Sequence, residues 1–274
     1  MLERFKYINS FNETLEFGKD CLFVNENDLR DFVWDITSKN NKISGFKKGV
    51  VSKTIPVILK CGSEAEGIEL RNRLFEVFEK DVLTNQHGKI YIGDYYLRCF
   101  ITGSTKSNYL IHKGYVEMSL TVQTDFPEWV KETTTNHTFS YENVGGFLDF
   151  PHDFAYDYKH QSRNATVINE NFVPSNFILR IFGSVTNPTL YISGHKYSVE
   201  VTVGENEYLT IDSINKTIIL TEDDGTKVNC FNNRSRDSYI FEKIPSGAND
   251  VTTLDDNFTF ELTLFNERSE PKWT

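Results

Sequence analysis

The chain has 274 residues and a formal net charge of −10, from 39 acidic and 29 basic side chains. Proteins bind nucleic-acid backbones mainly through lysine and arginine, so this acidic balance argues against specific nucleic-acid binding. The length exceeds that of a usual single domain and predicts two domains, each able to bury a core. With 22 Phe and 13 Tyr among the residues, the composition favours mainly β structure.

The N-terminal part begins with short runs of β-forming residues, and Pro56 in the last run predicts an edge position or a bulge. The runs are residues 5–8, 21–24, 32–36 and 53–60. A helix is predicted next, over residues 64–81. Ser63 and Glu66 have the spacing of a capping box. Its apolar stripe is expected to pack on a sheet. The stripe consists of Ile68, Leu74, Phe75, Val77 and Phe78.

Strands follow the helix. Gly93-Asp94 predicts a two-residue hairpin turn, and residues 115–122 alternate between apolar and polar side chains. The Thr-rich segment Lys131–Thr138 shows no apolar periodicity and is expected to be an extended linker. It places the domain boundary so that residues 1–131 form an N-terminal β-domain with one α-helix and residues 132–274 form a second domain.

The second half reads as short strands separated by turn residues, which is typical of a β-sandwich or jelly roll. The predicted strands are residues 176–182, 189–192, 195–203, 208–212, 216–221, 226–231 and 258–265. Trp273 follows the last strand after Pro271. Because a Trp carries a large apolar area, its indole is expected either to fill a pocket or to anchor a partner.

The four cysteines, Cys21, Cys61, Cys99 and Cys230, lie in or beside apolar runs and form no Cys-x-x-Cys pair. They predict free thiols in a reducing compartment rather than a disulfide framework. The first residues lack the apolar region of a signal peptide, and the chain contains no apolar stretch long enough for a transmembrane helix. No membrane association is expected.

One polar cluster offers metal-binding groups, but aromatic residues interleave with it and its spacing matches no known metal motif. The cluster is Asp149, His152, Asp153, Asp157 and His160. An aromatic-rich strand or loop with solvated charges explains these residues equally well. The chain also lacks a nucleophile elbow and a phosphate-binding glycine loop. We therefore assign no catalytic, cofactor-binding or metal-binding residue and expect neither a cofactor nor enzyme activity.

Several short stretches, in this order along the chain, resemble the distal tail proteins (Dit) of long-tailed bacteriophages and related prophage tails. They are Ile8–Phe11 with Glu16–Gly18, Gly114–Met118 through Asp125–Trp129, Asn187–Gly194, Leu209–Asp212 followed by Ile218, Ile244–Asn249, and Arg268–Trp273. Each stretch is only a few residues of strand or turn. Their order and the chain length carry the resemblance.

The resemblance implies an N-terminal β-domain that closes into a hexameric ring and a C-terminal galectin-like β-sandwich outside it. It implies a structural hub at the tail tip of the virion, assembled in the host cytoplasm. The implied partners are the major tail tube protein, the tail-associated baseplate protein and receptor-binding proteins. The family has no catalytic residues to transfer.

Two other readings remain open at the level of sequence. Aromatic residues on a β-sandwich could stack on sugar rings, so the second reading is a carbohydrate-binding or receptor-binding module for host cell-wall sugars. A glycosidase is a weaker reading, since it needs two facing carboxylates whose geometry a sequence does not define.

Overall fold

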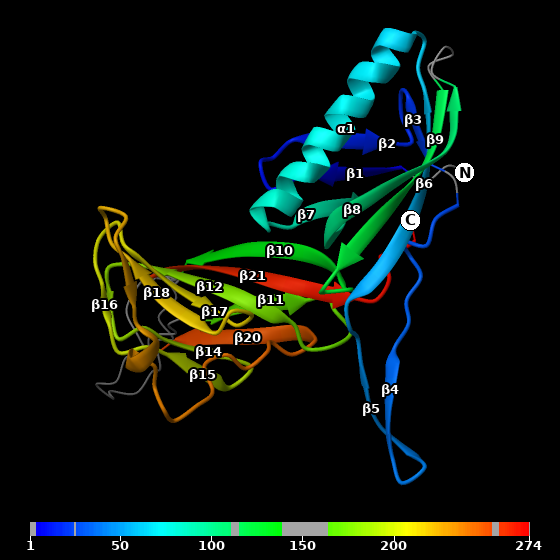
Figure 1. Ribbon diagram of the computed structural model, residues 1–274. Helices are drawn as coiled ribbons and strands as arrows, with labels where there is room; N and C mark the ends of the chain where they lie inside the picture. The colour runs from blue at the N-terminus through cyan, green and yellow to red at the C-terminus, as the bar shows by residue number, and fades with distance from the viewer. Residues whose placement is uncertain (1–3, 25, 111–114, 139–163, 254–257, 274) are drawn as a thin grey trace, which may run out of the picture. The chain divides into compact units, whose positions relative to one another are not determined.

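The computed structural model describes residues 4–24, 26–110, 115–138, 164–253 and 258–273 (Figure 1). The chain divides into two compact units. The first unit comprises residues 1–131 and 267–274, and the second comprises residues 132–266. Two strands, β10 and β21, have residues in both units. The fold class predicted from the sequence is confirmed, because the described residues form antiparallel β-sheets and one α-helix.

The first unit is an antiparallel β-structure on which a helix packs. Its strands are β1 (Phe5–Ile8), β2 (Thr14–Phe17), β3 (Leu22–Val24), β4 (Asp35–Lys39), β5 (Lys42–Lys47), β6 (Val51–Lys60), β7 (Gly88–Ile92), β8 (Tyr95–Leu110) and β9 (Tyr115–Thr124). One series of neighbours is β2-β1-β7-β8, and a second is β8-β9-β6-β3. The long strand β8 therefore joins the two ladders. Its first residues pair with β7 and its later residues with β9.

Pro56 in β6 pairs with Ser119 in β9 on one side. It lies just outside the residues of β6 that pair with β3 on the other side. This position agrees with the predicted edge location, since proline donates no hydrogen bond to a ladder. The predicted Gly93-Asp94 hairpin is also confirmed. Ile92 pairs with Tyr95, and Gly93 has a φ of 57° that suits glycine.

Helix α1 (Glu64–Thr84) begins where the capping box predicted, because the Ser63 side chain accepts a hydrogen bond from the backbone N–H of Glu66. It ends three residues later than predicted, at a left-handed Asn85. Leu74, Val77 and Phe78 are buried in the core of the first unit, as expected. The prediction is wrong for Ile68 and Phe75, whose side chains are 43% and 64% exposed.

The second unit is a β-sandwich. One sheet has the order β19-β18-β17-β12-β21-β10, and the other has the order β11-β20-β14-β15. The strands are β10 (Trp129–Thr138), β11 (Asn164–Asn169), β12 (Asn176–Phe182), β13 (Val185–Thr186), β14 (Thr189–Ile192), β15 (His195–Ser198), β16 (Thr202–Val203), β17 (Tyr208–Asp212), β18 (Thr217–Thr221), β19 (Lys227–Asn229), β20 (Gly247–Thr253) and β21 (Thr259–Arg268). Side chains from both sheets, including Phe177, Phe260, Leu190 and Tyr197, form its core.

The segment Lys131–Thr138 is not a linker, and that expectation is wrong. It belongs to β10, which lies beside β21 in the sheet. Threonine hydroxyls connect the two strands, with 2.9 Å between the Oγ1 atoms of Thr134 and Thr263. Polar cross-strand pairs therefore hold this part of the sheet.

Candidate functional site

The structure directs attention to exposed surfaces. The polar cluster that offered metal-binding groups but was not assigned as a metal site lies outside the described residues; it comprises Asp149, His152, Asp153, Asp157 and His160. Among the residues that are described, no group of three or more His, Cys, Asp or Glu side chains is placed to hold a metal ion. In the same part of the chain, no helix has the length and apolar character needed to cross a membrane.

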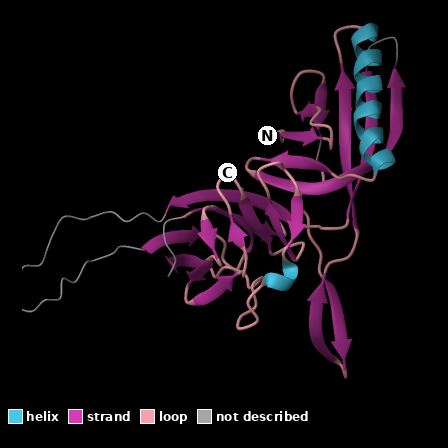
Figure 2. Ribbon diagram, turned by 90° about the vertical axis from the view of Figure 1, so that its left-hand side faces the viewer, coloured by secondary structure: helices cyan, strands magenta, loops and turns pink. Residues whose placement is uncertain are grey.

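The most prominent exposed feature is the hairpin of β4 and β5, which we call the arm (residues 32–50). In the described part of the chain, β4 and β5 pair only with each other. Asn40 and Asn41, with φ values of 50° and 55°, form the two-residue turn that this tight hairpin requires. Figures 1 and 2 show the hairpin as a separate ribbon that extends away from the sheets of the first unit.

The arm carries large apolar side chains that no core of its own covers. Phe46 is 61% exposed, Ile36 and Ile43 are each 60% exposed, and every residue of β4 is exposed. The other exposed apolar residues of the arm are Phe32, Val33, Trp34 and Val50. A lone two-stranded hairpin is marginally stable in water, and an apolar patch of this kind usually marks an interaction site. The arm is thus built to be covered by another surface.

The root of the arm is fixed to the rest of the first unit by Lys48. Its side chain is 6% exposed, and its Nζ lies 2.7 Å from Oε1 of Glu128. The same ammonium donates to the hydroxyl of Ser269 at 2.6 Å and lies 4.3 Å from the ring centre of Trp34. The ion pair is buried and has further hydrogen bonds. It therefore holds the C-terminal end of the arm to the loop between β9 and β10 and to the C-terminal segment.

The C-terminal segment also contacts the rest of the first unit through Arg30. Its guanidinium donates to the carbonyl oxygen of Pro271 at 3.1 Å and stacks 4.0 Å from the ring centre of Trp273. Trp273 is nevertheless 74% exposed, so the expectation that its indole fills a pocket is wrong. Its N–H donates to Glu270. The alternative expectation, that Trp273 anchors a partner, stays a prediction.

Helix α1 presents a second exposed apolar surface that borders its buried face. Ile68, Phe75 and Val82 follow one another at intervals of seven residues, with exposed fractions of 43%, 64% and 41%. Leu83 extends the stripe and is 77% exposed. Side chains at this spacing lie along one face of a helix. The first unit therefore shows two apolar surfaces, one on the arm and one on α1.

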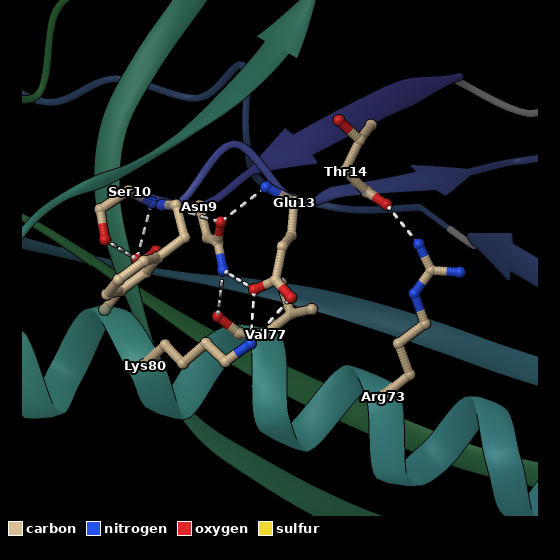
Figure 3. A network of polar contacts seen from close by, with 9 residues as sticks. Asn9, Ser10, Glu13, Thr14, Arg73, Val77 and Lys80 are labelled. Atoms are coloured by element: carbon tan, nitrogen blue, oxygen red, sulfur yellow. Dashed lines mark hydrogen bonds and ion pairs between the residues drawn. The ribbon is translucent and has the colours of Figure 1, made fainter.

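Polar contacts hold the buried side of α1 against the turn between β1 and β2 (Figure 3). Lys80 Nζ lies 2.7 Å from Oε1 of Glu13, and the Asn9 amide donates to Glu13 at 2.7 Å and to the Val77 carbonyl at 3.3 Å. The hydrogen bond from Lys80, followed by the one from Asn9, lowers the pKa of Glu13. Arg73 donates to the Thr14 carbonyl at 3.2 Å. These contacts fix the turn of α1 that precedes Val82.

Asp81 completes this network from inside. Its Oδ1 accepts the backbone N–H of Ser10 at 2.8 Å and the Ser10 hydroxyl at 2.7 Å, while its Oδ2 accepts the hydroxyl of Tyr7. Burial, followed by this hydrogen bond, raises the pKa of Tyr7. The chain passes close by at Gly88, where any side chain would collide with Tyr7 and Asp81. All three groups that donate to Asp81 are uncharged, and the network stabilises the fold.

Sequence reasoning found part of the arm but not its hairpin or its exposure. Residues 32–36 were predicted as a β-like run, and the strand begins only at Asp35. A signal was present, since Asn40-Asn41 can form a two-residue turn and lies between Ile36 and Ile43. Apolar alternation alone does not tell a buried strand from a strand that another chain covers.

No family model matches the chain, and no curated protein matches it in sequence. Solved structures do match. The crystal structure of the phage SPP1 Dit protein, described as a paradigm of the hub adsorption apparatus in phages that infect Gram-positive bacteria, is 12% identical with a TM-score of 0.62. The match covers 95% of this chain and 98% of that one.

Two baseplate structures give similar results. A chain of the phage P2 baseplate in its activated conformation with Ca is 12% identical with a TM-score of 0.62, over 99% of this chain and 100% of that one. The phage p2 baseplate with Sr gives a TM-score of 0.61 at 12% identity, over 98% and 99%. At these identities the likeness concerns the fold. This chain has the fold of a phage Dit protein over nearly its whole length, which confirms the resemblance at that level.

Proposed function

We propose that this protein is a structural hub of a phage tail tip or baseplate, without enzyme activity, that assembles as a hexameric ring around the DNA channel. The exposed arm is the observation that carries this proposal. Apolar side chains on both strands of a lone hairpin need a covering surface, and a further copy of the chain is the simplest source of one. The fold shared with SPP1 Dit supports the same conclusion.

An arm that docks on a different surface of the next copy makes a heterologous contact. Repeated contacts of this kind close into a ring when the rotation between copies allows it. The net charge of −10 suits a channel through which DNA slides without adhering. In this proposal residues 1–131, with the C-terminal segment, form the ring, and the sandwich serves as a docking domain.

The hub would join the tail tube protein to the tail-associated baseplate protein and to receptor-binding proteins. Its place would be the tail tip of the virion, after assembly in the cytoplasm of the host bacterium. The relatives in fold support this, because two of them are chains of a phage baseplate. Assembly with tail partners adds to ring stability by mass action, so the isolated ring would depend on protein concentration.

Light scattering after size-exclusion chromatography tests the ring at tens of micromolar protein. The wild-type chain is expected to give a hexamer, alone or in exchange with smaller species. Ile43→Asp places a charge on the arm and is expected to give monomers. The matched control is Ile168→Asp on β11 of the sandwich, because Ile168 is 61% exposed and Ile43 is 60% exposed.

Circular dichroism of both variants checks that each is folded. A monomeric wild-type protein that stays monomeric even beside the tube and baseplate proteins would refute the hub proposal. If the Ile43→Asp variant is still a hexamer, the ring proposal stands, but the arm is not the main contact between its copies.

The rival function, a carbohydrate-binding module, has one supporting observation. Tyr239 in the sandwich is 55% exposed, and the Nζ atom of Lys216 lies 5.5 Å from its ring centre. Exposed aromatic rings can stack on sugars. We nevertheless expect the full chain to bind no simple sugar more tightly than about millimolar, roughly −4 kcal/mol. Micromolar binding on a glycan array that is lost in Tyr239→Ala would favour the rival.

A further inference from the structure

Two cysteines lie close together where β3 begins and β6 ends. Leu22 in β3 pairs with Leu59 in β6, and the pairing continues outward because the backbone N–H of Lys60 donates to the carbonyl of Cys21 at 2.9 Å. Cys21 is the residue before β3, and Cys61 is the residue after β6. The antiparallel register thus brings two thiols that are far apart in sequence to the same end of one strand pair.

The surroundings of the two thiols differ. Cys61 is 8% exposed and is part of the core of the first unit, whereas Cys21 is half-buried and packs against that core. Burial, followed by a hydrogen bond with the Cys21 thiol, raises the pKa of Cys61 to about 12. Both cysteines are free in the structure. The pair therefore consists of one half-buried thiol and one buried thiol at the same end of the strand pair.

We propose that Cys21 and Cys61 form an oxidation site, at which a small-molecule disulfide converts the two thiols into an intramolecular disulfide. The register places Cys21 opposite Lys60, so Cys21 and Cys61 are diagonal neighbours across the strand pair. A disulfide bridges Cα atoms that are about 4.4–6.8 Å apart. The other two cysteines offer no such partner among the described residues, since Cys99 lies inside β8 and Cys230 lies in the second unit.

The reaction proceeds by two exchanges. The Cys21 thiolate attacks one sulfur of the small disulfide, which forms a mixed disulfide and releases one small thiol. Cys61 then loses its proton and attacks the Cys21 sulfur, which forms the protein disulfide and releases the second small thiol. Two cysteine thiols are oxidised and one small disulfide is reduced to two thiols. Because the pKa of Cys61 is raised, the second exchange accelerates as the pH rises.

The disulfide would close the loop from residue 22 to residue 60, which contains the whole arm. Closing a loop removes conformational freedom from the unfolded chain and stabilises the first unit. Reducing cytoplasm keeps such thiols free, and the exterior of the cell favours their oxidation. If the proposed function holds, the arm's loop is open during assembly in the host and is covalently closed in the released particle.

The test uses the full-length reduced protein, incubated with oxidised glutathione at mildly alkaline pH. Free thiols are then counted with Ellman's reagent in denaturant. We expect the count to fall from four to two, and peptide mapping without reductant to find Cys21 linked to Cys61. The oxidised protein should melt several degrees higher than the reduced protein. Cys61→Ser should stop at a mixed disulfide on Cys21, and Cys99→Ser, as the control, should oxidise like the wild type.

Four remaining thiols, a link between two chains, or a link that includes Cys99 or Cys230 would overturn the proposal. A glutathione adduct on Cys61 in the wild-type protein, with Cys21 unmodified, would overturn the order of exchange and with it the site. None of these measurements depends on oligomeric state. The light-scattering result can therefore fail while the oxidation site stands, or the reverse.

Discussion

Asp81 is fully buried, and its carboxylate accepts three hydrogen bonds from Tyr7 and Ser10. In Asp81→Asn, an amide NH2 group replaces one carboxylate oxygen and faces the donors of Tyr7 or Ser10. Because a buried polar group without its partner is costly, we expect a loss of about 2–4 kcal/mol in the free energy of unfolding. Urea denaturation measures this. Glu76→Gln, on the exposed side of the same helix, is the control and should change stability by less than about 0.5 kcal/mol.

A loss below about 1 kcal/mol in Asp81→Asn would contradict this account. It would mean that the network of Figure 3 relaxes around the amide and does not hold the β1–β2 turn on α1.

His137 makes the stability of the second unit depend on pH. Its ring stacks on Phe260 with 5.0 Å between ring centres, and its Nε2 has no hydrogen-bond partner among the described residues. Burial lowers its pKa below the ordinary value of 6.5. The folded state therefore binds the proton less readily than the unfolded state. The stabilisation is complete above the unfolded pKa of 6.5 and is lost as the pH falls below it.

Thermal unfolding between about pH 7 and pH 5 tests this prediction. The melting temperature of the second unit should fall as the solution is acidified, and His137→Gln should reduce that slope. An identical slope in the variant would show that other groups are responsible.

At the scale of elements, α1 has two apolar faces with different roles. Phe78 is 6% exposed and meets Tyr7 edge to face at 5.3 Å, whereas Phe75 is 64% exposed. Phe78→Ala should cost about 3–5 kcal/mol because it removes buried surface and leaves a cavity. Phe75→Ala should cost less than about 1 kcal/mol in the isolated chain. Chemical denaturation compares the two, and equal losses would contradict the assignment of faces.

The sequence predicted the elements that have a strong periodic pattern. Helix α1, the Gly93-Asp94 hairpin and the alternating strand β9 were found because their patterns arise from burial on one side. The Thr-rich β10 was missed, since its hydroxyl pairs with β21 leave no apolar alternation. Phe75 was misjudged because apolar side chains look alike in a sequence whether or not a core covers them.

At the scale of the molecule, the second unit is an insertion in the first. Residues 132–266 stand between the two segments of the first unit, and the strands that enter and leave, β10 and β21, are neighbours in one sheet. The insertion has its own core between two sheets. We expect residues 132–266, expressed alone, to fold cooperatively. Calorimetry should find one unfolding transition, and a broad transition without a heat-absorption peak would contradict the prediction.

The lysines of the arm oppose aggregation of the protein before its arm is covered. A hairpin with apolar side chains and two open edges is a template for irregular stacking with other hairpins. Lys39, Lys42 and Lys47 stand exposed among these residues. Their like charges keep two arms from pairing edge to edge, while a single arm can still dock on an acidic or neutral surface. In the proposed assembly, free subunits would therefore stay unaggregated until the arm docks on a neighbouring copy.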